Sequence, residues 1–248
     1  MKAALKRVVP ERLRPRLRAS FTRLRSFGWQ RYCLICTSHL NGFLTHGEPP
    51  ETDFRCPVCH SKPPHRLAAY YFSEHPEIYR EGGTFVHIAP ESGLGPYLAQ
   101  LARRRGMHYR SGDVKGVGDS HLDLLALPFA DGSIHMLYAC HVLNSLQEDR
   151  AAMREVRRVL HPDGVAVLQV PAFCTANDTI ETRGHDERMR VFADDGIYRC
   201  YTNADYEQRL QASGFTVECV RATSLPDAQV RKAALKQELL HACRADLR

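Results

Sequence analysis

Four cysteines near the amino terminus have the type and spacing of a metal site. Cys33 and Cys36 form one C-x-x-C pair, and Cys56 and Cys59 form a second pair after nineteen intervening residues. Each pair places two thiolates on one tight turn, and two such turns supply the four soft ligands that tetrahedral Zn²⁺ prefers. The spacing is typical of zinc ribbons. We therefore expect one structural zinc ion at these four cysteines.

Other chemistry fits the same cysteines less well. A catalytic zinc needs an open coordination position, which four thiolates do not leave. A redox C-x-x-C motif normally stands alone rather than in pairs. We expect the nearby histidines to be ordinary surface residues rather than substitute ligands: His39, His46, His60 and His65. The other five cysteines are single and scattered, a pattern typical of a reduced cytosol with one metal site.

A second group of residues has the order expected of an adenosine-binding site. The turn after residues 84–88 contains Gly93 and Gly95, which allow a ligand to approach the backbone closely. Asp113 stands twenty residues beyond Gly93, where a carboxylate can accept from both hydroxyls of a ribose. Asp123 follows Asp113 in the sequence, and its carboxylate can accept a hydrogen bond from the amino group of an adenine. Because no G-x-x-x-x-G-K-[ST] loop is present, the pattern predicts an adenosine cofactor without a phosphate.

Alternating strands and helices must position these residues. Short β-type runs predict strands over 84–88, 108–112, 134–140, 165–170 and 215–220. Helical patterns with stop signals predict helices over 65–72, 94–105, 149–160 and 204–213. This alternation predicts an α/β fold with a doubly wound, mostly parallel sheet, preceded by the small four-cysteine zinc ribbon. Ligands of such sheets bind outside the carboxyl ends of the strands at the switch point. The residues after 220 have no clear pattern.

Residues 134–143 and 154–164 resemble two motifs of class I S-adenosylmethionine-dependent methyltransferases. The first stretch ends in H-V-L, and the second contains R-V-L-H-P-D-G, the most specific part of the resemblance. The methyltransferase type 11 group shows this pattern, and some of its members carry a leading zinc ribbon. The resemblance covers about residues 84–220. It implies S-adenosylmethionine as the cofactor and a seven-stranded, Rossmann-like sheet with a final antiparallel strand.

Carried over position by position, the resemblance implies which residues bind the cofactor. These residues are His87, Ala89, Glu91, Gly93, Asp113, Asp123, Leu124 and Cys140. The chain departs from the family in the first motif, where His87 replaces the usual acid and Ala89 and Glu91 replace two of three glycines. Glu91 either binds the ammonium group of the cofactor or obstructs its site. After H-V-L, Asn144-Ser145 replaces the frequent Glu-His, which removes two titratable groups near the expected substrate entrance.

Candidate catalytic residues follow the fourth strand. Methyl transfer from a sulfonium depends mainly on alignment, but an acceptor that carries a proton benefits from a base. His141 is the candidate base, with Asp195 and Tyr198 as alternatives, and a structural role for His141 stays open. The long polar segment 172–202 predicts a lid or a substrate-binding insertion. Its aromatic residues line either an acceptor pocket or a small core: Phe173, Phe192, Tyr198 and Tyr201.

Residues 1–31 predict a basic amphipathic arm. They contain ten Lys or Arg against one Glu, a net charge of +9, whereas the remaining 217 residues carry −3. A helix is expected over 14–27, with Gly28 as its stop. Its apolar stripe has helical spacing: Leu13, Leu17, Phe21 and Leu24. Residues 1–27 could contact an anionic membrane or a nucleic acid, or the apolar stripe could pack on the protein's own domain. We expect the stripe to pack on the protein's own domain, with residual attraction of the arm to anionic surfaces. A mitochondrial targeting sequence has the same composition.

These patterns divide the chain into three parts. The arm takes residues 1–31, the zinc ribbon with a linker helix takes 32–72, and the methyltransferase domain takes 73–248. Charged residues at 25% and hydrophobic residues at 44% exclude a largely disordered or collagen-like chain. No stretch reaches the roughly 18 apolar residues of a transmembrane helix, and no secretory signal is recognisable, so we expect a cytoplasmic protein.

The predicted function is S-adenosylmethionine-dependent methyl transfer to a small-molecule or glycan acceptor. One alternative is an RNA methyltransferase that grips RNA with its ribbon and arm, although the ribbon has few basic residues: Arg55, Lys62 and Arg66. Another is a cofactor-less scaffold of the same fold, because the first motif has lost glycines. DNA methylation is disfavoured, since no N/D-P-P-Y/F motif follows the fourth strand and Cys140 lacks the proline neighbour of a pyrimidine C5 nucleophile.

Overall fold

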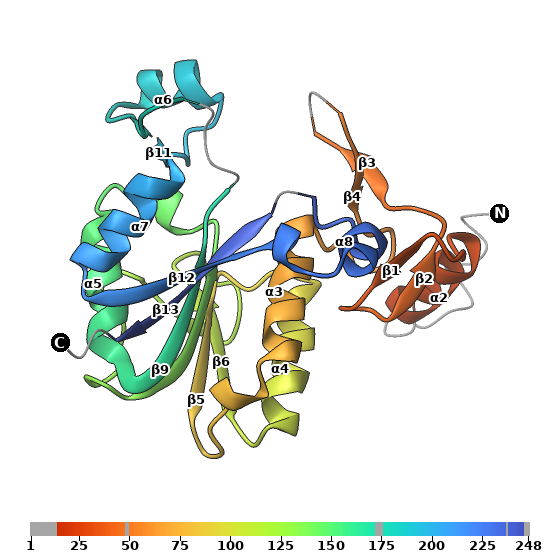
Figure 1. Cartoon of the computed structure of the whole chain (residues 1–248), viewed down its shortest axis with the longest axis horizontal. Coiled ribbons are helices and arrows are strands. Elements are labelled where there is room, and N and C mark those ends of the chain that lie inside the picture. Colours follow the sequence, from red (N-terminus) through yellow and green to blue (C-terminus); the bar gives the residue numbers. More distant parts are fainter. Residues whose placement is uncertain (1–13, 48–49, 172–175, 237, 246–248) are drawn as a thin grey trace.

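A seven-stranded sheet forms the centre of the computed structural model (Figure 1). The described residues are 14–47, 50–171, 176–236 and 238–245. In order across the sheet, the strands are β12 (Phe215–Arg221), β13 (Leu239–Ala245), β9 (Leu160–Gln169), β8 (Ile134–Cys140), β5 (Thr84–Ile88), β6 (His108–Asp113) and β7 (Ser120–His121). β13 is antiparallel to both neighbours, and the other pairs are parallel. The predicted doubly wound, mostly parallel sheet is confirmed.

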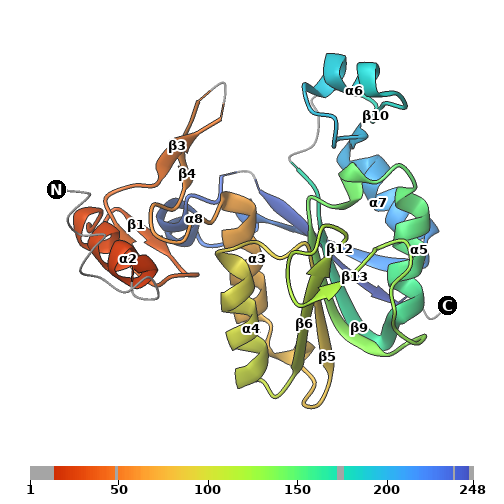
Figure 2. The ribbon, with the colours of Figure 1, turned by 180° about the vertical axis from the view of Figure 1, so that it is seen from behind.

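Helices cover both faces of the sheet, which explains its long apolar strands. In β8, Met136 and Tyr138 belong to one apolar cluster, and Leu137 and Ala139 belong to the other, because successive side chains alternate across a strand. The first face packs against α3 (Pro63–Glu74) and α4 (Leu94–Arg104), and the second against α5 (Asp149–Val159) and α7 (Asn203–Ala212) (Figures 1 and 2).

Most of the predicted elements agree closely with the observed ones, but β9 begins at Leu160 rather than at 165, and the short elements within 180–200 were not predicted. β5 and β8 have the predicted bounds, and the predicted helix over 94–105 is α4. The stretch without a clear pattern forms α8 (Asp227–Ala233) and β13. β13 has the sequence L-L-H-A-C-R-A and is buried at six of its seven positions, so it shows no alternation that would mark a strand.

A short loop, rather than a helix, connects β6 to β7. Residues 114–119 lie between the two strands and form no helix. Gly112 permits the close return of the chain, because a Cβ atom there would lie 2.0 Å from the Ser120 carbonyl oxygen. The chain therefore loops back immediately after Asp113, at the carboxyl end of β6, and then pairs with this end of β6 in parallel as β7.

The four-cysteine unit consists of two antiparallel strand pairs. These are β1 (Arg31–Cys33) with β2 (Ser38–Leu40), and β3 (Leu44–His46) with β4 (Glu51–Arg55). Arg66 of α3 joins this unit to the sheet domain, and it is completely buried. Its guanidinium donates to the carbonyls of Phe54 (3.0 Å) and Ser61 (2.9 Å) in the unit, and of Ala233 (2.6 Å) and Ala234 (3.2 Å) at the end of α8. Arg66 is therefore unavailable for contact with RNA.

The arm helix is α2 (Arg14–Arg25), close to the predicted range. The expected docking of its apolar stripe is wrong, because Leu17, Phe21 and Leu24 are 51%, 66% and 78% exposed. The helix instead contacts the four-cysteine unit through a polar side chain: Arg23 donates to Ser38 Oγ (3.0 Å) and to the Cys36 carbonyl (2.8 Å).

Some predictions concern residues that the structure does not describe. Leu13 and the start of the arm fall within 1–13, and Phe173 falls within 172–175, so both lie outside the described residues. Among the residues that are described, no helix is long and apolar enough to cross a membrane.

Candidate active site

The candidate site lies at the carboxyl ends of three adjacent parallel strands. β5 stands between β8 and β6, so the sheet order reverses beside β5. Ala89 follows β5, Asp113 ends β6, and Cys140 ends β8 with His141 after it. Residues that are distant in the sequence thus meet at the switch point, where ligands of doubly wound sheets bind.

Two residues of this edge have left-handed backbone conformations. Ala89 has φ +51° and His141 has φ +57°. Such conformations suit glycine and cost other residues of order 1–3 kcal/mol, and they are concentrated at functional sites. Ala89 therefore adopts a backbone conformation that suits glycine, and its N–H donates to the Gly112 carbonyl at 2.8 Å.

The Glu91 carboxylate is held from two sides by histidines. His87 Nε2 lies 3.0 Å from Glu91 Oε2, and His65 Nε2 of α3 lies 3.6 Å from Glu91 Oε1. His87 is completely buried, and its Nδ1 lies 2.7 Å from the Tyr109 hydroxyl. Because an ionised carboxylate can only accept, the Nε2–H of His87 donates to Glu91. Burial raises the pKa of Glu91, but the hydrogen bond and charge of His87 outweigh burial and lower the pKa overall. Glu91 is therefore an ionised carboxylate.

His65, Glu91 and Cys140 also have ligand atoms within 4.8 Å of one another. A metal ion bound to His65 Nε2 would require the ring proton to be on Nδ1, and Nδ1 could then not accept a hydrogen bond. Nδ1 instead accepts from the Lys62 N–H (3.4 Å), which leaves the proton on Nε2, toward Glu91. The group is thus a hydrogen-bonded carboxylate rather than a metal site. The expectation that His65 is a surface residue is wrong, since it is only 8% exposed.

The two acids assigned to the adenosine part of the cofactor also stabilise their own loops. Asp113 Oδ1 accepts from the Lys115 N–H (2.8 Å) and the Val117 N–H (2.7 Å). Asp123 Oδ1 accepts from the Leu125 N–H (2.9 Å), and the neighbouring Leu124 is buried. In both carboxylates, Oδ2 has no hydrogen-bond partner within the described part of the chain.

Gly93 approaches the four-cysteine unit closely. A Cβ atom on Gly93 would lie 2.3 Å from the Cys59 carbonyl oxygen. The sequence predicts close approach of a ligand at this glycine, whereas the structure fills the space beside its Cα with the second C-x-x-C turn. An open groove of about 440 Å³ lies along the same seam and includes Cys59, Gly93 and Tyr97 in its lining.

His141 places an imidazole nitrogen at this edge without a hydrogen bond. Its Nε2 atom is buried and has no partner among the described residues. Burial lowers the pKa of His141 to about 4, and the nearby His65 and Lys62 act in the same direction. The imidazole is therefore neutral near pH 7 and can accept a proton.

Asp195 and Tyr198 belong to a small unit that projects beyond the carboxyl edge (Figures 1 and 2). This unit contains β10 (Ile180–Glu181), α6 (His185–Phe192) and β11 (Arg199–Cys200). The Asp195 carboxylate accepts from Arg188 (2.7 Å) and lies 2.8 Å from His185 Nδ1, and the hydrogen bond from Arg188 lowers its pKa. Tyr198 donates its N–H to the Asn144 carbonyl (2.9 Å), which connects the unit to the turn after β8.

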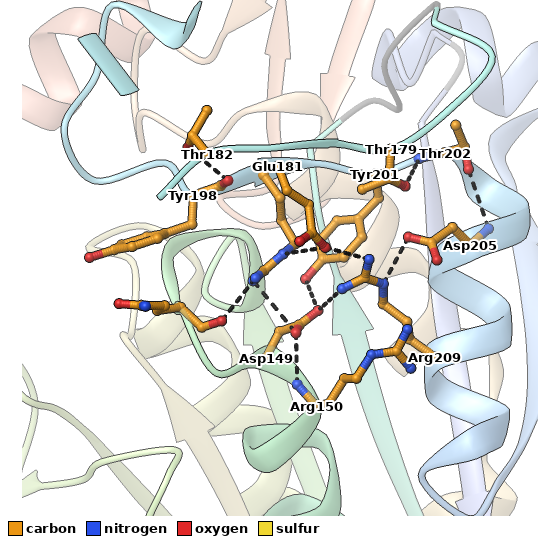
Figure 3. Close-up of polar contacts among 12 residues, drawn as sticks. Asp149, Arg150, Thr179, Glu181, Thr182, Tyr198, Tyr201, Thr202, Asp205 and Arg209 are labelled. Atoms are coloured by element: carbon orange, nitrogen blue, oxygen red, sulfur yellow. Dashed lines mark hydrogen bonds and ion pairs between the residues drawn. The ribbon is translucent and has the colours of Figure 1, made fainter. Parts of the chain in front are cut away.

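A buried polar cluster fastens this unit to α5 and α7 (Figure 3). Asp149 at the start of α5 is 3% exposed and accepts from the Tyr201 hydroxyl (2.8 Å) and from Arg209 Nη1 of α7 (3.1 Å). Glu181 forms an ion pair with the same arginine, and Arg199 of β11 lies 3.6 Å from the Asp149 carboxylate. Tyr201 is thus a core residue of this cluster. Sequence reasoning missed these contacts because the partners lie 28 to 60 residues apart.

The four cysteine sulfurs have the separation of a tetrahedral metal site. All four lie within 4.8 Å of one another, with 3.6 Å between Cys33 and Cys59 and 3.7 Å between Cys36 and Cys56. Sulfurs at about 2.3 Å from a tetrahedral Zn²⁺ stand about 3.8 Å apart. The donor set and its size therefore fit one zinc ion.

Comparison with known proteins agrees with the fold and the class of enzyme. Residues 91–168 match the Methyltransf_11 family, described as a methyltransferase domain. The CMeT domain of the citrinin polyketide synthase has a TM-score of 0.52 at 13% identity, covering 77% of this chain and 54% of that one. The family match and the seven-stranded sheet support a methyltransferase enzyme with a Rossmann-like fold.

Two further solved structures are similar to this chain. A complex of the Haloferax volcanii Trm112 methyltransferase activator with a methyltransferase has a TM-score of 0.47 at 17% identity, covering 71% of this chain and 89% of that one. A phosphoethanolamine N-methyltransferase of Haemonchus contortus has a TM-score of 0.48 at 11% identity, covering 71% of this chain and 52% of that one. No curated protein matches the chain in sequence.

Proposed function

We propose that this chain binds S-adenosylmethionine at the carboxyl edge of β5, β6 and β8 and transfers its methyl group to a small-molecule or glycan acceptor. One observation supports the proposal: Glu91, Asp113 and His141 stand at or just beyond the carboxyl ends of the adjacent strands β5, β6 and β8. The class of enzyme rests on the matched domain. The cofactor, its contacts and the acceptor class are our inference from the chemistry of these side chains.

The adenosine part of the cofactor would be held by Asp113 and Asp123. Each carboxylate uses Oδ1 to cap its own loop. The loop contacts fix the orientation of the carboxylates, and Oδ2 remains to accept from a ribose hydroxyl or an adenine amino group. The buried Leu124 would support the adenine face.

The methionine part would meet the Glu91 carboxylate. Its Oε2 atom is held by His87 Nε2 at 3.0 Å, and a carboxylate fixed in this way favours a contact with an ammonium group over obstruction. The two histidines keep the carboxylate ionised, and an ionised carboxylate binds an ammonium group more strongly than a neutral acceptor does. His87, Ala89, Gly93 and Cys140 would shape this part of the site.

The bound cofactor supplies an activated sulfonium methyl group, so the residues of this chain mainly orient the acceptor and exclude water. His141 would accept the acceptor's proton at Nε2, since this nitrogen lies at the site edge and has no partner among the described residues. Asp195 is already engaged by Arg188 and His185, which favours His141 over Asp195 as the base. Tyr198 stays an alternative beside the turn after β8.

A small acceptor is favoured over RNA by the position of the basic residues. Arg66, one of three basic residues in the ribbon, is completely buried. The projecting unit around α6 is fastened to α5 and α7 by the Asp149 cluster and would close the acceptor pocket. We infer that residues 1–27 contact an anionic surface without taking part in methyl transfer.

We also propose that Cys33, Cys36, Cys56 and Cys59 bind one structural Zn²⁺. The sulfur separations support it, and so does the small size of the unit, which has little core of its own. Through Cys59 and Gly93, this ion would support the loop after β5.

Transfer of a labelled methyl group into a fractionated cell extract tests the proposed reaction. With wild-type protein, label from S-adenosylmethionine is expected in the small-molecule or glycan fraction, and His141→Ala should reduce it strongly. Incorporation confined to RNA would overturn the proposed acceptor class. A wild-type protein that binds the cofactor but labels no fraction would contradict methyl transfer.

A further inference from the structure

The arm and the turn after it present a concentrated apolar surface. Eleven large hydrophobic side chains are exposed in the described part of the chain, and five of them fall within thirteen residues. These five, named the arm face here, are Leu17, Phe21, Leu24, Phe27 and Trp29, with exposed fractions between 49% and 78%. Single exposed hydrophobic residues need no explanation, but a cluster of this kind marks an interaction surface.

The arm face is held outward by contacts on the other side of the helix. Arg23 of α2 donates hydrogen bonds to Ser38 Oγ and to the Cys36 carbonyl, and the Asn41 N–H donates to the Ser26 carbonyl at 2.9 Å. Beyond the helix, the Trp29 ring packs on His39 with 4.8 Å between ring centroids. The helix lies at one end of the molecule, against β1 and β2 (Figures 1 and 2). Its apolar side is therefore positioned for a partner outside this chain.

The charge of the arm selects the kind of partner. Residues 1–31 carry a net charge of +9, whereas the rest of the chain carries −3. The partner must be anionic and must also accept apolar side chains. A nucleic acid offers charge without an apolar phase, and a second copy of the arm would bring two strongly positive segments together. An anionic phospholipid surface offers both properties.

We propose that the arm face docks this protein on anionic phospholipid membranes. Leu17, Phe21 and Leu24 enter the boundary between headgroups and acyl chains, and the net positive charge of the arm sequence attracts it to the lipid phosphates. Phe27 and Trp29 occupy the interface, where aromatic rings are favoured. This attachment is peripheral and independent of the methyl-transfer reaction.

Trp29 is the single tryptophan of the chain and therefore reports directly on docking. The full chain is mixed with vesicles of phosphatidylcholine alone or with about 30% phosphatidylserine, and binding is measured by co-sedimentation and by Trp29 fluorescence. We expect a blue shift and at least about tenfold stronger binding to the anionic vesicles.

Leu17→Ser/Phe21→Ser/Leu24→Ser should reduce vesicle binding at least about tenfold with an unchanged melting temperature, because these side chains are exposed. Leu125→Ser/Val191→Ser, which changes exposed residues outside the arm face, should bind like wild type. Full vesicle binding by the triple serine variant would overturn the proposal. So would a wild-type dimer that this variant abolishes, or a Trp29 spectrum that responds to RNA and not to vesicles.

Discussion

Arg66→Met should destabilise the folded protein by about 3–5 kcal/mol, the cost of breaking a buried charged network. Arg66 is completely buried, and its guanidinium donates to four carbonyls in two distant parts of the chain. Within the described residues it forms no ion pair with a carboxylate. Burial lowers the pKa of Arg66, and the Cys33, Cys56 and Cys59 thiolates act in the opposite direction, so the arginine faces the electronegative four-cysteine site.

The magnitude follows from two opposing contributions. Methionine fills the volume of the arginine stem but donates no hydrogen bond, and each buried carbonyl left without a donor costs about 1–3 kcal/mol. Removing the buried cation recovers part of its desolvation cost, so the four losses do not add fully. For a chain of this size, 1 kcal/mol shifts the melting temperature by about 2–4 °C, which predicts a decrease of about 6–20 °C.

Calorimetry and urea unfolding with zinc and a reductant measure this effect. Arg103→Met on α4 is the matched control, because Arg103 is exposed, and it should change stability by less than about 0.5 kcal/mol. Arg66→Lys keeps the charge but cannot reach all four carbonyls, so its stability should be intermediate. A melting temperature for Arg66→Met within about 2 °C of wild type would refute the role of this side chain.

Metal analysis should find about one zinc per wild-type chain, none after Cys33→Ser and one after Cys219→Ser; less than about half an equivalent in wild type would contradict the site. Ala89→Gly should raise the free energy of unfolding by about 1 kcal/mol, since it relieves a left-handed backbone at φ +51°, and a loss of stability would count against that strain. Burial raises the pKa of Glu238 from near 4.5 to about 7, so the folded state retains a proton that the unfolded state releases, and stability should fall as pH rises across this interval. Glu238→Gln should flatten this dependence of stability on pH. Parallel curves of melting temperature against pH for wild type and Glu238→Gln would contradict the prediction.

Local patterns were sufficient to predict most of the sheet. β5 and β8 are apolar runs between clear turns, and their bounds follow from the sequence alone. β13 could not be found in this way, because it is buried on both faces, and its partners β9 and β12 pair with it only in the folded chain. The position of Asp113 at a strand end was predicted, because it directly follows the strand expected over 108–112.

Contacts between distant segments account for what the sequence did not reveal. His65 has no motif around it, and its burial follows from the packing of α3 beside the loop that carries Glu91. Gly93 has the spacing of a ligand-binding glycine, yet the Cys59 carbonyl occupies the space beside it. Helical periodicity identified Leu17, Phe21 and Leu24 of the arm face, but whether they face the protein or the solvent depends on Arg23 and its partners in the ribbon.

Calorimetric titration with S-adenosylmethionine tests the central claim most directly. The account predicts saturable binding of one cofactor per chain, and Asp113→Asn should weaken it by about tenfold or more, because the ribose loses a charged acceptor while the Oδ1 contacts of the loop are kept. Asp163→Asn, which changes an exposed carboxylate near the amino end of β9, should bind like wild type. Absence of binding by the wild-type protein, or equal affinity of Asp113→Asn and wild type, would contradict a cofactor site at this edge.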